Sequence, residues 1–246
     1  MQATRAVRAV QPSSTGIHPH SIAMPRTARV APGGMVFHVL NRGVGRMRVF
    51  EADEDCAAWE RAIEETLRVA PIRICAYCWM PNHWHFVLWP QRDGELSEFM
   101  QRLTNMHAQR WQRAKRRVGY GHLYQGRFKS FPVESDEHFY GVARYVERNA
   151  LRAGLVERAE DWAWGSLWRR ARGLRQPLLS AWPLEEPREW VEHVNRPQTE
   201  AELAAIRRSV RRGSPYGSLG WSEQAAEQLG WQSTLDPRGR PRHACS

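Results

Sequence analysis

The sequence predicts an α+β domain in which helices pack on an antiparallel sheet and a helical extension follows. Short runs rich in β-branched and aromatic residues alternate with longer segments whose apolar residues recur at helical spacing. The 42% hydrophobic content of the 246 residues is enough for one sizeable core. No apolar run approaches the ~20 residues that a membrane-spanning helix needs.

The predicted domain begins with a strand and a helix. Residues 35–40 form an apolar run that predicts the first strand, and a glycine-containing turn follows it. Asp53 is typical of a helix cap, because apolar side chains then recur at helical spacing until Pro71 ends the pattern.

A hairpin and a second helix come next. Residues 72–79 and 83–89 have the composition of strands, and the three residues between them predict a short turn. The segment from Leu96 to Val118 predicts a helix with one apolar face and a cluster of arginines toward its end.

One more strand and a third helix complete the predicted domain. Residues 128–133 predict the fourth strand, and Ser135 opens a helix that continues to about Leu151. The order β-α-β-β-α-β-α matches the split β-α-β plan of ferredoxin-like folds with one added helix. We therefore expect the third strand, residues 83–89, to lie in the interior of the sheet.

Three segments are expected along the chain. Residues 1–30 are rich in Pro, Ser, Thr, Ala and Arg without periodicity, which predicts a disordered leader or a start codon assigned too early. Residues 31–170 hold the predicted sheet domain. Residues 171–246 are expected to form a helical extension with a basic tail, packed onto the domain by an aromatic cluster of Trp162, Trp164 and Trp168.

The charge of the chain favours a polyanionic partner. A formal net charge of +10 and a pI near 10.2 are typical of proteins that bind nucleic acid or an acidic membrane surface. Lysine occurs only at Lys115 and Lys129, so the codon bias of a GC-rich genome is an alternative source of the many arginines. The absence of an apolar secretory segment predicts a cytoplasmic location.

The cysteines do not predict a disulfide framework or a metal site. Four cysteines are too few to form a disulfide framework for a chain of this length. Cys75 and Cys78 have C-x-x-C spacing, but residues three apart in a strand face opposite sides. We therefore expect no zinc or redox role for this pair.

Two histidines in the third predicted strand form half of a metal site. Because side chains alternate between the faces of a strand, His83 and His85 point to one side and Trp84 to the other. Two neutral imidazoles on a rigid element can hold a divalent cation if a third ligand arrives from elsewhere. A pair of ordinary core or surface histidines is the alternative.

Tyr145 and Asn149 in the third predicted helix supply the missing parts. They lie four residues apart and share a helical face. The side-chain oxygen of Asn149 could complete a cation site for Mg²⁺ or Mn²⁺, which could polarise a phosphodiester. The Tyr145 hydroxyl would then attack phosphorus and form a covalent phosphotyrosine, which conserves the ester bond energy for rejoining.

The segment from about Met35 to Trp168 resembles the HUH single-tyrosine transposases, in which two histidines flank a bulky apolar residue. The likeness is greatest to their REP-associated tyrosine transposase branch. It rests on four stretches, which are His38-Val39-Leu40-Asn41-Arg42-Gly43, Met80-Pro81-Asn82-His83-Trp84-His85, Gln125-Gly126-Arg127-Phe128-Lys129-Ser130, and Tyr145 through Asn149 to Val156. One departure is that Ala150 follows Asn149, where family members commonly have proline.

The resemblance implies a function and a set of roles. The implied protein is a bacterial, nucleoid-associated enzyme that binds single-stranded DNA with an imperfect hairpin and cuts it. It attaches the 5′ phosphate to tyrosine and leaves a free 3′ hydroxyl. Carried over by position, Tyr145 is the nucleophile and His83, His85 and Asn149 are the metal ligands. The alternative function is a domesticated hairpin-binding protein that organises or represses repeats without cutting them.

The expected DNA contacts are basic residues in three regions. The arginines at the end of the second predicted helix could follow a hairpin backbone or form an ordinary solvated face. The full set of expected contacts is Arg42, Arg110, Arg113, Arg116, Arg117, Arg127 and Lys129.

Several alternatives remain open in the sequence. Tyr140, Tyr120 and Tyr124 are competing tyrosines, although none of them has an amide at i+4. His38 could approach the metal or a phosphate, or could be structural. The oligomeric state, monomer or homodimer, also stays open.

Overall fold

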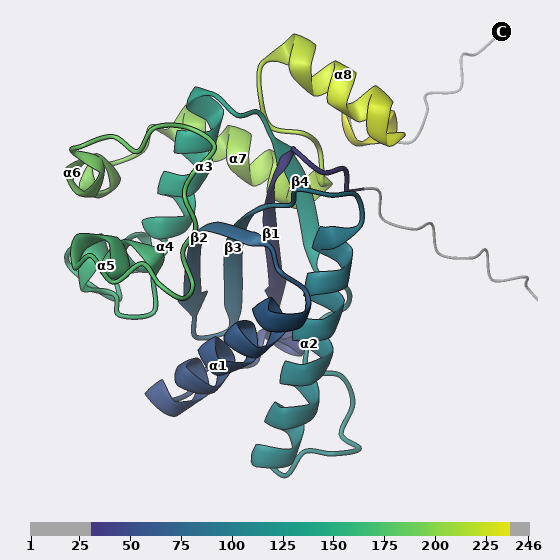
Figure 1. Cartoon of the computed structure of the whole chain (residues 1–246), viewed down its shortest axis with the longest axis vertical. Helices are drawn as coiled ribbons and strands as arrows, with labels where there is room; N and C mark the ends of the chain where they lie inside the picture. The colour runs from purple at the N-terminus through teal and green to yellow at the C-terminus, as the bar shows by residue number, and fades with distance from the viewer. Residues whose placement is uncertain (1–30, 237–246) are drawn as a thin grey trace, which may run out of the picture.

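A four-stranded antiparallel sheet forms the centre of the protein, in a computed structural model that describes residues 31–236 (Figure 1). The strand order is β2-β3-β1-β4, so the histidine-bearing strand is interior, as predicted. The predicted leader at residues 1–30 and the basic tail at 239–242 lie outside the described residues. The strands are β1 (Val36–Arg42), β2 (Arg73–Met80), β3 (His83–Trp89) and β4 (Lys129–Val133).

Helices pack on the sheet and continue into the extension. The predicted α+β class is confirmed, including helices in the C-terminal region. Among the helices that the structure describes, none is long and apolar enough to cross a membrane. The α-helices are α1 (Asp53–Val69), α2 (Glu95–Ala114), α3 (Glu137–Glu147), α4 (Asn149–Arg152), α5 (Ser166–Ala171), α6 (Trp190–Asn195), α7 (Glu200–Arg212) and α8 (Leu219–Leu229). Short 3-10 segments are η1 (Val44–Arg46), η2 (Ala159–Asp161) and η3 (Gln232–Thr234).

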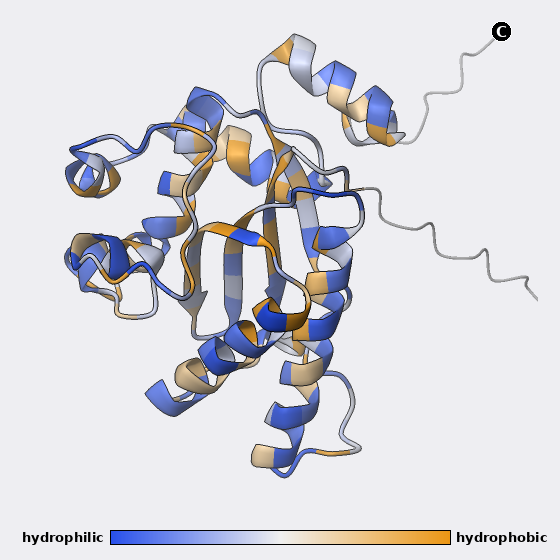
Figure 2. Ribbon diagram, in the orientation of Figure 1, coloured by the Kyte–Doolittle hydropathy of each residue, from blue (hydrophilic) through white to orange (hydrophobic). Residues whose placement is uncertain are grey.

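The alternation of side chains along β3 separates two cores. Trp84, Phe86 and Leu88 belong to a cluster with the apolar faces of α1 and α2. Val87 points to the other side and packs in a cluster with α3 and the C-terminal helices. In Figure 2, hydrophobic colour follows β1 between these layers, whereas the turns of α1 and α2 are largely hydrophilic. The two histidines of β3 therefore lie on the α3 side of the sheet.

Three predicted elements differ locally in the structure. The second predicted helix does not reach Val118, because α2 ends at Ala114 and Arg116 has a left-handed backbone (φ 54°). The third helix does not run unbroken to Leu151, because α3 ends at Glu147 and Arg148 separates it from α4. The prediction that Cys75 and Cys78 face opposite sides is wrong. A bulge between Ile74 and Ala76 shifts the alternation of β2, so both thiols lie buried in the α3-side cluster. Burial raises the pKa of each thiol to about 12, and both are free cysteines.

The C-terminal extension shares the core on the α3 side. Trp182, Trp190 and Ile206 are buried in the same cluster as Val142 and Val146 of α3. The backbone at Tyr216 also runs beside β4, where its amide donates to the Pro132 carbonyl and its carbonyl accepts from the Glu134 amide. Residues after 171 therefore support both the helix and the sheet edge that form the site described next.

Candidate active site

Strand pairing fixes the places of the two β3 histidines. His83 pairs with Arg42 of β1 at the end of the sheet. His85 pairs with Leu40, two residues further into the sheet. Their ring centres are 5.0 Å apart, with the planes almost perpendicular. His85 is only 4% exposed, whereas His83 is half-buried at the opening of the sheet. The shared face that the alternation predicted is therefore present in the structure.

Each of these histidines has its Nδ1 atom engaged. His83 Nδ1 lies 2.6 Å from Asn82 Oδ1, which requires the nitrogen to donate. His85 Nδ1 lies 2.8 Å from Nε2 of His38. A hydrogen bond at Nδ1 orients an imidazole and leaves Nε2 as the atom available for a ligand. Both rings therefore have the second contacts that metal-binding histidines usually have.

His38 is a third histidine of the cluster, which sequence reasoning left unassigned. It lies on β1, fully buried, with its ring stacked on that of His85 at 5.0 Å between centres. Its own Nδ1 is buried and has no hydrogen-bond partner. Because side chains alternate along β1, His38 lies on the same face as Arg42. This alternation was the signal in the sequence that could have placed His38 in the site. The register against β3, which determines its neighbour, was not readable from the sequence.

Tyr145 reaches this cluster from α3. Its ring centre lies 6.1 Å from that of His38 and 6.1 Å from that of His85, in edge-to-face geometry with both. Tyr140 points elsewhere, because its hydroxyl donates to the Glu185 carbonyl. Tyr124 is buried on the α2 side, where its hydroxyl is 2.6 Å from His107 Nδ1. Of the tyrosines considered, the structure brings Tyr145 to the histidines.

Asn149 and Tyr145 are joined by Arg152, whose role sequence reasoning missed. Arg152 Nη2 donates to Asn149 Oδ1 at 2.6 Å, and its Nη1 donates to the Tyr145 carbonyl at 3.2 Å. The guanidinium carbon also lies 4.1 Å from the centre of the Tyr145 ring. Asn149 Nδ2 is buried without a partner. The i+3 spacing from Asn149 to Arg152, both in α4, was the signal in the sequence that could have identified this contact.

Burial and positive charge keep the histidines neutral. Desolvation, with the charge of Arg152 second, lowers the pKa of His38 to about 3. Desolvation followed by the charges of Arg42 and Arg152 lowers the pKa of His83 to about 4. Desolvation also lowers the pKa of His85 well below its usual value, and the neighbouring histidines add to this effect. At neutral pH these rings are imidazoles with lone pairs available for a cation.

The residues of the cluster fit a divalent cation. Neutral imidazoles from His83 and His85 and an amide oxygen from Asn149 are a suitable donor set. The orphaned Asn149 Nδ2 and His38 Nδ1 show that the polar groups of this site are not fully satisfied by the protein itself. Arg152 now holds the Asn149 oxygen, so it would have to release that atom for the amide to act as a ligand.

The predicted DNA-contacting residues fall into two groups. Arg42 is the strand partner of His83, and exposed Lys129 pairs with Leu40 on the same side of the sheet. Arg127 is exposed just before β4. The α2 arginines belong to the opposite layer, and Arg110 forms a two-pronged ion pair with Glu65 of α1 at 2.9 and 2.7 Å. The remaining members of that group, Arg113, Arg116 and Arg117, are exposed.

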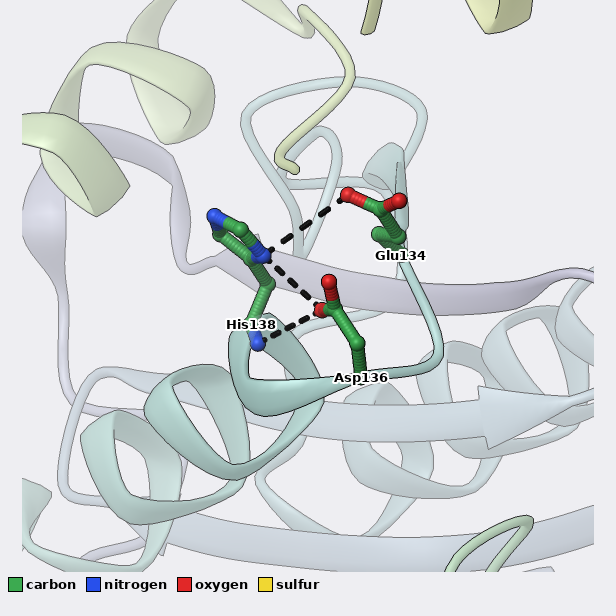
Figure 3. A group of neighbouring side chains, drawn as sticks. All are labelled: Glu134, Asp136 and His138. Atoms are coloured by element: carbon green, nitrogen blue, oxygen red, sulfur yellow. Dashed lines mark hydrogen bonds and ion pairs between the residues drawn. The ribbon is translucent and has the colours of Figure 1, made fainter. Parts of the chain in front are cut away.

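A second group with potential cation ligands lies before α3. Ligand atoms of Glu134, Asp136 and His138 lie within 4.8 Å of one another (Figure 3). Asp136 caps α3 by accepting from the His138 amide at 2.8 Å, and it also accepts from the ring Nδ1 at 2.8 Å. Glu134 accepts from the Ser218 amide at 2.7 Å. These contacts account for the cluster as the cap of α3 and a tie to the extension.

Comparison with known proteins finds a family model and solved structures that are similar to this chain. Residues 33–149 match the family model described as transposase IS200 like. A solved structure of a REP-associated tyrosine transposase bound to a REP hairpin is similar at 20% identity, covering 67% of this chain and 94% of that chain with a TM-score of 0.46. A candidate transposase from Deinococcus radiodurans R1 is similar at 20% identity, covering 46% of this chain and 88% of that chain with a TM-score of 0.34. No curated protein matches the chain in sequence.

Proposed function

We propose that this chain is a metal-dependent nuclease and strand transferase for single-stranded DNA, since residues 33–149 match the IS200-like transposase family model. The proposed substrate lies near a hairpin of a repetitive palindromic element. The observation that carries the proposal is the packing of Tyr145 against His38 and His85, beside Asn149 and Arg152. A nucleophile, candidate metal ligands and a cationic group thus meet on one face of the sheet.

The proposed reaction is a transesterification. Tyr145 Oη forms a bond to phosphorus, and the bond from phosphorus to the 3′ oxygen breaks. The phenol proton leaves Tyr145, and the departing 3′ oxygen takes up a proton, so charge balances over the step. The products are a 5′ phosphotyrosine and a free 3′ hydroxyl. The reverse attack by a 3′ hydroxyl would rejoin DNA without an external energy source.

The side chains of the site have distinct proposed roles. His83, His85 and Asn149 would hold Mg²⁺ or Mn²⁺, which when bound supplies positive charge that polarises the phosphodiester. His38 orients His85 through their 2.8 Å contact. Arg152, released from Asn149, would place a second positive charge beside the phosphate and the phenolate oxygen. Tyr145 and the histidines belong to one chain, which supports use of the tyrosine in cis.

DNA would approach at the end of the sheet where His83 is half-buried. Arg42, Arg127 and Lys129 surround that end and are suited to phosphate contacts. The net charge of +10 favours such a partner. Exposed Arg113, Arg116 and Arg117, on the far layer, would contact the backbone of a hairpin stem only if the stem extends past α2.

A denaturing gel tests the proposal directly. Radiolabelled single-stranded hairpins from the DNA that flanks the coding gene are incubated with the protein and Mn²⁺. We expect a protein-linked band with the native chain, none with Tyr145→Phe, and none with His83→Ala. Tyr145→Phe should still bind the same oligonucleotide in a filter assay.

The second candidate function is a hairpin-binding protein that does not cut. It is favoured by the hydrogen bond from Arg152 to Asn149, which occupies the amide oxygen that a metal would need. Binding of matched hairpins with no protein-linked band in either Mg²⁺ or Mn²⁺ would support this function over cleavage.

A further inference from the structure

A cavity of about 580 Å³ lies beside α3, between α3, α6 and the segment at Tyr216. Gly141 and Arg144 line it from α3, and Trp190 and His193 line it from α6. Its volume is in the range of sites that take a small organic molecule. The mechanism proposed above uses none of these residues.

The cavity lining suits a planar, uncharged ligand with both donors and acceptors. Two aromatic rings, Tyr140 and Tyr216, contribute apolar surface for stacking, and Trp190, only 2% exposed, closes part of the wall. Carboxylates of Glu137, Glu189 and Glu202 accompany the two arginines, Arg144 and Arg196. This mixture of charges disfavours a phosphate group or any other anion as the main occupant.

Arg144 lines this cavity, but its unpartnered donor is turned into the protein. The residue is 6% exposed, and its Nε is buried without a hydrogen-bond partner. Its Nη2 is engaged, donating to the carbonyls of Arg196 and Pro197 at 2.6 and 3.0 Å. A buried guanidinium N–H without an acceptor is costly unless a ligand or water provides one.

His193 adds a neutral ring to the same wall. Desolvation, with the charges of Arg144 and Arg196 next, lowers its pKa, while Glu202 opposes the shift. The ring lies 5.3 Å from that of Trp190, centre to centre. It can therefore donate or accept a hydrogen bond without adding charge.

We propose that this cavity binds one unpaired nucleobase of the DNA strand whose phosphate is attacked by Tyr145. This inference rests on the proposed function. Gly141 precedes Tyr145 by one helical turn, about 6 Å along the axis, so a nucleotide close to the scissile phosphate is within reach. Bases carry amino groups for the carboxylates, ring acceptors for the His193 imidazole, and a π face for the tyrosine rings. The base would lie along α3, about one turn before the phosphate that Tyr145 attacks.

Photocrosslinking tests this placement. The probe is a single-stranded hairpin library with flanking random nucleotides, in which 5-iododeoxyuridine replaces thymidine, bound to the Tyr145→Phe protein. We expect mass spectrometry to find crosslinked peptides containing Tyr140, Trp190 or Tyr216. Crosslinks confined to other peptides would overturn the inference. An excess of free nucleosides that removes the crosslink while the DNA stays bound would instead assign the cavity to a free nucleoside, and would also overturn it.

A cavity-filling substitution provides a second test. A Cβ at Gly141 would lie 3.6 Å from the Tyr216 hydroxyl, an ordinary contact, so Gly141→Met adds a side chain toward the cavity without a backbone clash. We expect this change to weaken binding of the library about tenfold, the scale of one lost base stack. The matched control is Gly220→Met in α8, where a Cβ meets nothing within 4 Å. Equal affinity of the two folded variants would contradict the inference.

The two proposals fail in different ways. If the native chain forms no adduct and binds no hairpin, the proposed function fails. If the adduct forms at Tyr145 but no crosslink reaches the cavity, only the nucleobase inference fails.

Discussion

Arg152 is the residue that sets the charge of the candidate active site. Its guanidinium contacts Asn149 and the Tyr145 ring, and its charge lowers the pKa of all three histidines. In the absence of DNA, the Arg152 guanidinium competes with a metal ion for Asn149 Oδ1 and for the space between Asn149 and Tyr145. A DNA phosphate would attract Arg152 and so favour metal binding as well.

Arg152→Ala should therefore raise the Mn²⁺ affinity of the DNA-free protein. Unit charges 4 Å apart repel by about 1 kcal/mol in water and by more in a partly buried site, which predicts at least about a fivefold gain. Titration followed by electron paramagnetic resonance measures free Mn²⁺ directly. Arg172→Ala, on the surface beside Trp168, is the matched control. An unchanged or lower affinity in Arg152→Ala would refute this role.

His107 on α2 should make folding sensitive to acid. Burial lowers its pKa to about 3, from 6.5 in the unfolded chain, so the native state binds fewer protons between these values. Its contribution is fully present above pH 6.5 and is lost as the pH falls toward 3, with a slope of up to about 1.4 kcal/mol per pH unit. Urea unfolding from pH 7 to pH 4 should show a smaller loss for His107→Gln than for the native chain. The same pH dependence in both proteins would rule out the effect.

Helix α3 is the element that joins the sheet to the extension. Its Glu147 is buried and accepts from Ser166 Oγ and from Trp190 Nε1, each at 2.5 Å. Arg170 Nε also donates to Glu147, at 3.1 Å, with both side chains almost fully buried. These bonds tie α5 and α6 to the helix that presents Tyr145.

Glu147→Ala should destabilise the fold strongly. The change leaves the buried Arg170 without one of its carboxylate partners, a loss of about 3–5 kcal/mol in comparable cases. Urea denaturation measures the free energy of unfolding. Glu192→Ala removes an exposed partner of Arg158 and should cost less than about 1 kcal/mol. Similar losses in the two variants would contradict the importance of the buried pair.

The sequence predicted the elements of the site better than their junctions. Period two along β3 placed His83 and His85 on one face, and helical spacing linked Tyr145 to Asn149. Junctions depend on long-range packing, so the break at Arg148 was invisible. The bulge in β2 was missed for the same reason, because a single extra residue in a strand leaves no signature in composition. The role of each site residue stays a prediction until activity is measured.

At the scale of the whole molecule, the extension is part of the folding unit. Buried residues from α6 and α7 complete the α3-side core, and Tyr216 pairs beside β4. The predicted boundary at residue 170 separates segments of sequence. In the structure, core contacts and backbone hydrogen bonds join residues on its two sides. A site on α3 therefore depends on residues far along the chain.

A chain truncated at Arg172 should lose cooperative unfolding. Removal of α6 and α7 would take Trp190, Val194, Leu203 and Ile206 out of the α3-side cluster and expose apolar surface of that cluster to water. Near-ultraviolet circular dichroism and calorimetry, compared with the full chain, would detect the loss of fixed packing. A sharp calorimetric transition at the temperature of the full chain would show that the first segment folds alone.

The central claim is that Tyr145 becomes covalently joined to DNA. The most direct measurement is mass spectrometry of the protein-linked product formed from a single-stranded hairpin with Mn²⁺, after digestion with trypsin and nuclease. We predict that the peptide containing Tyr145 carries a nucleotide, joined through its 5′ phosphate to the Tyr145 hydroxyl oxygen. An adduct on Tyr120, Tyr140 or any other residue would contradict the claim.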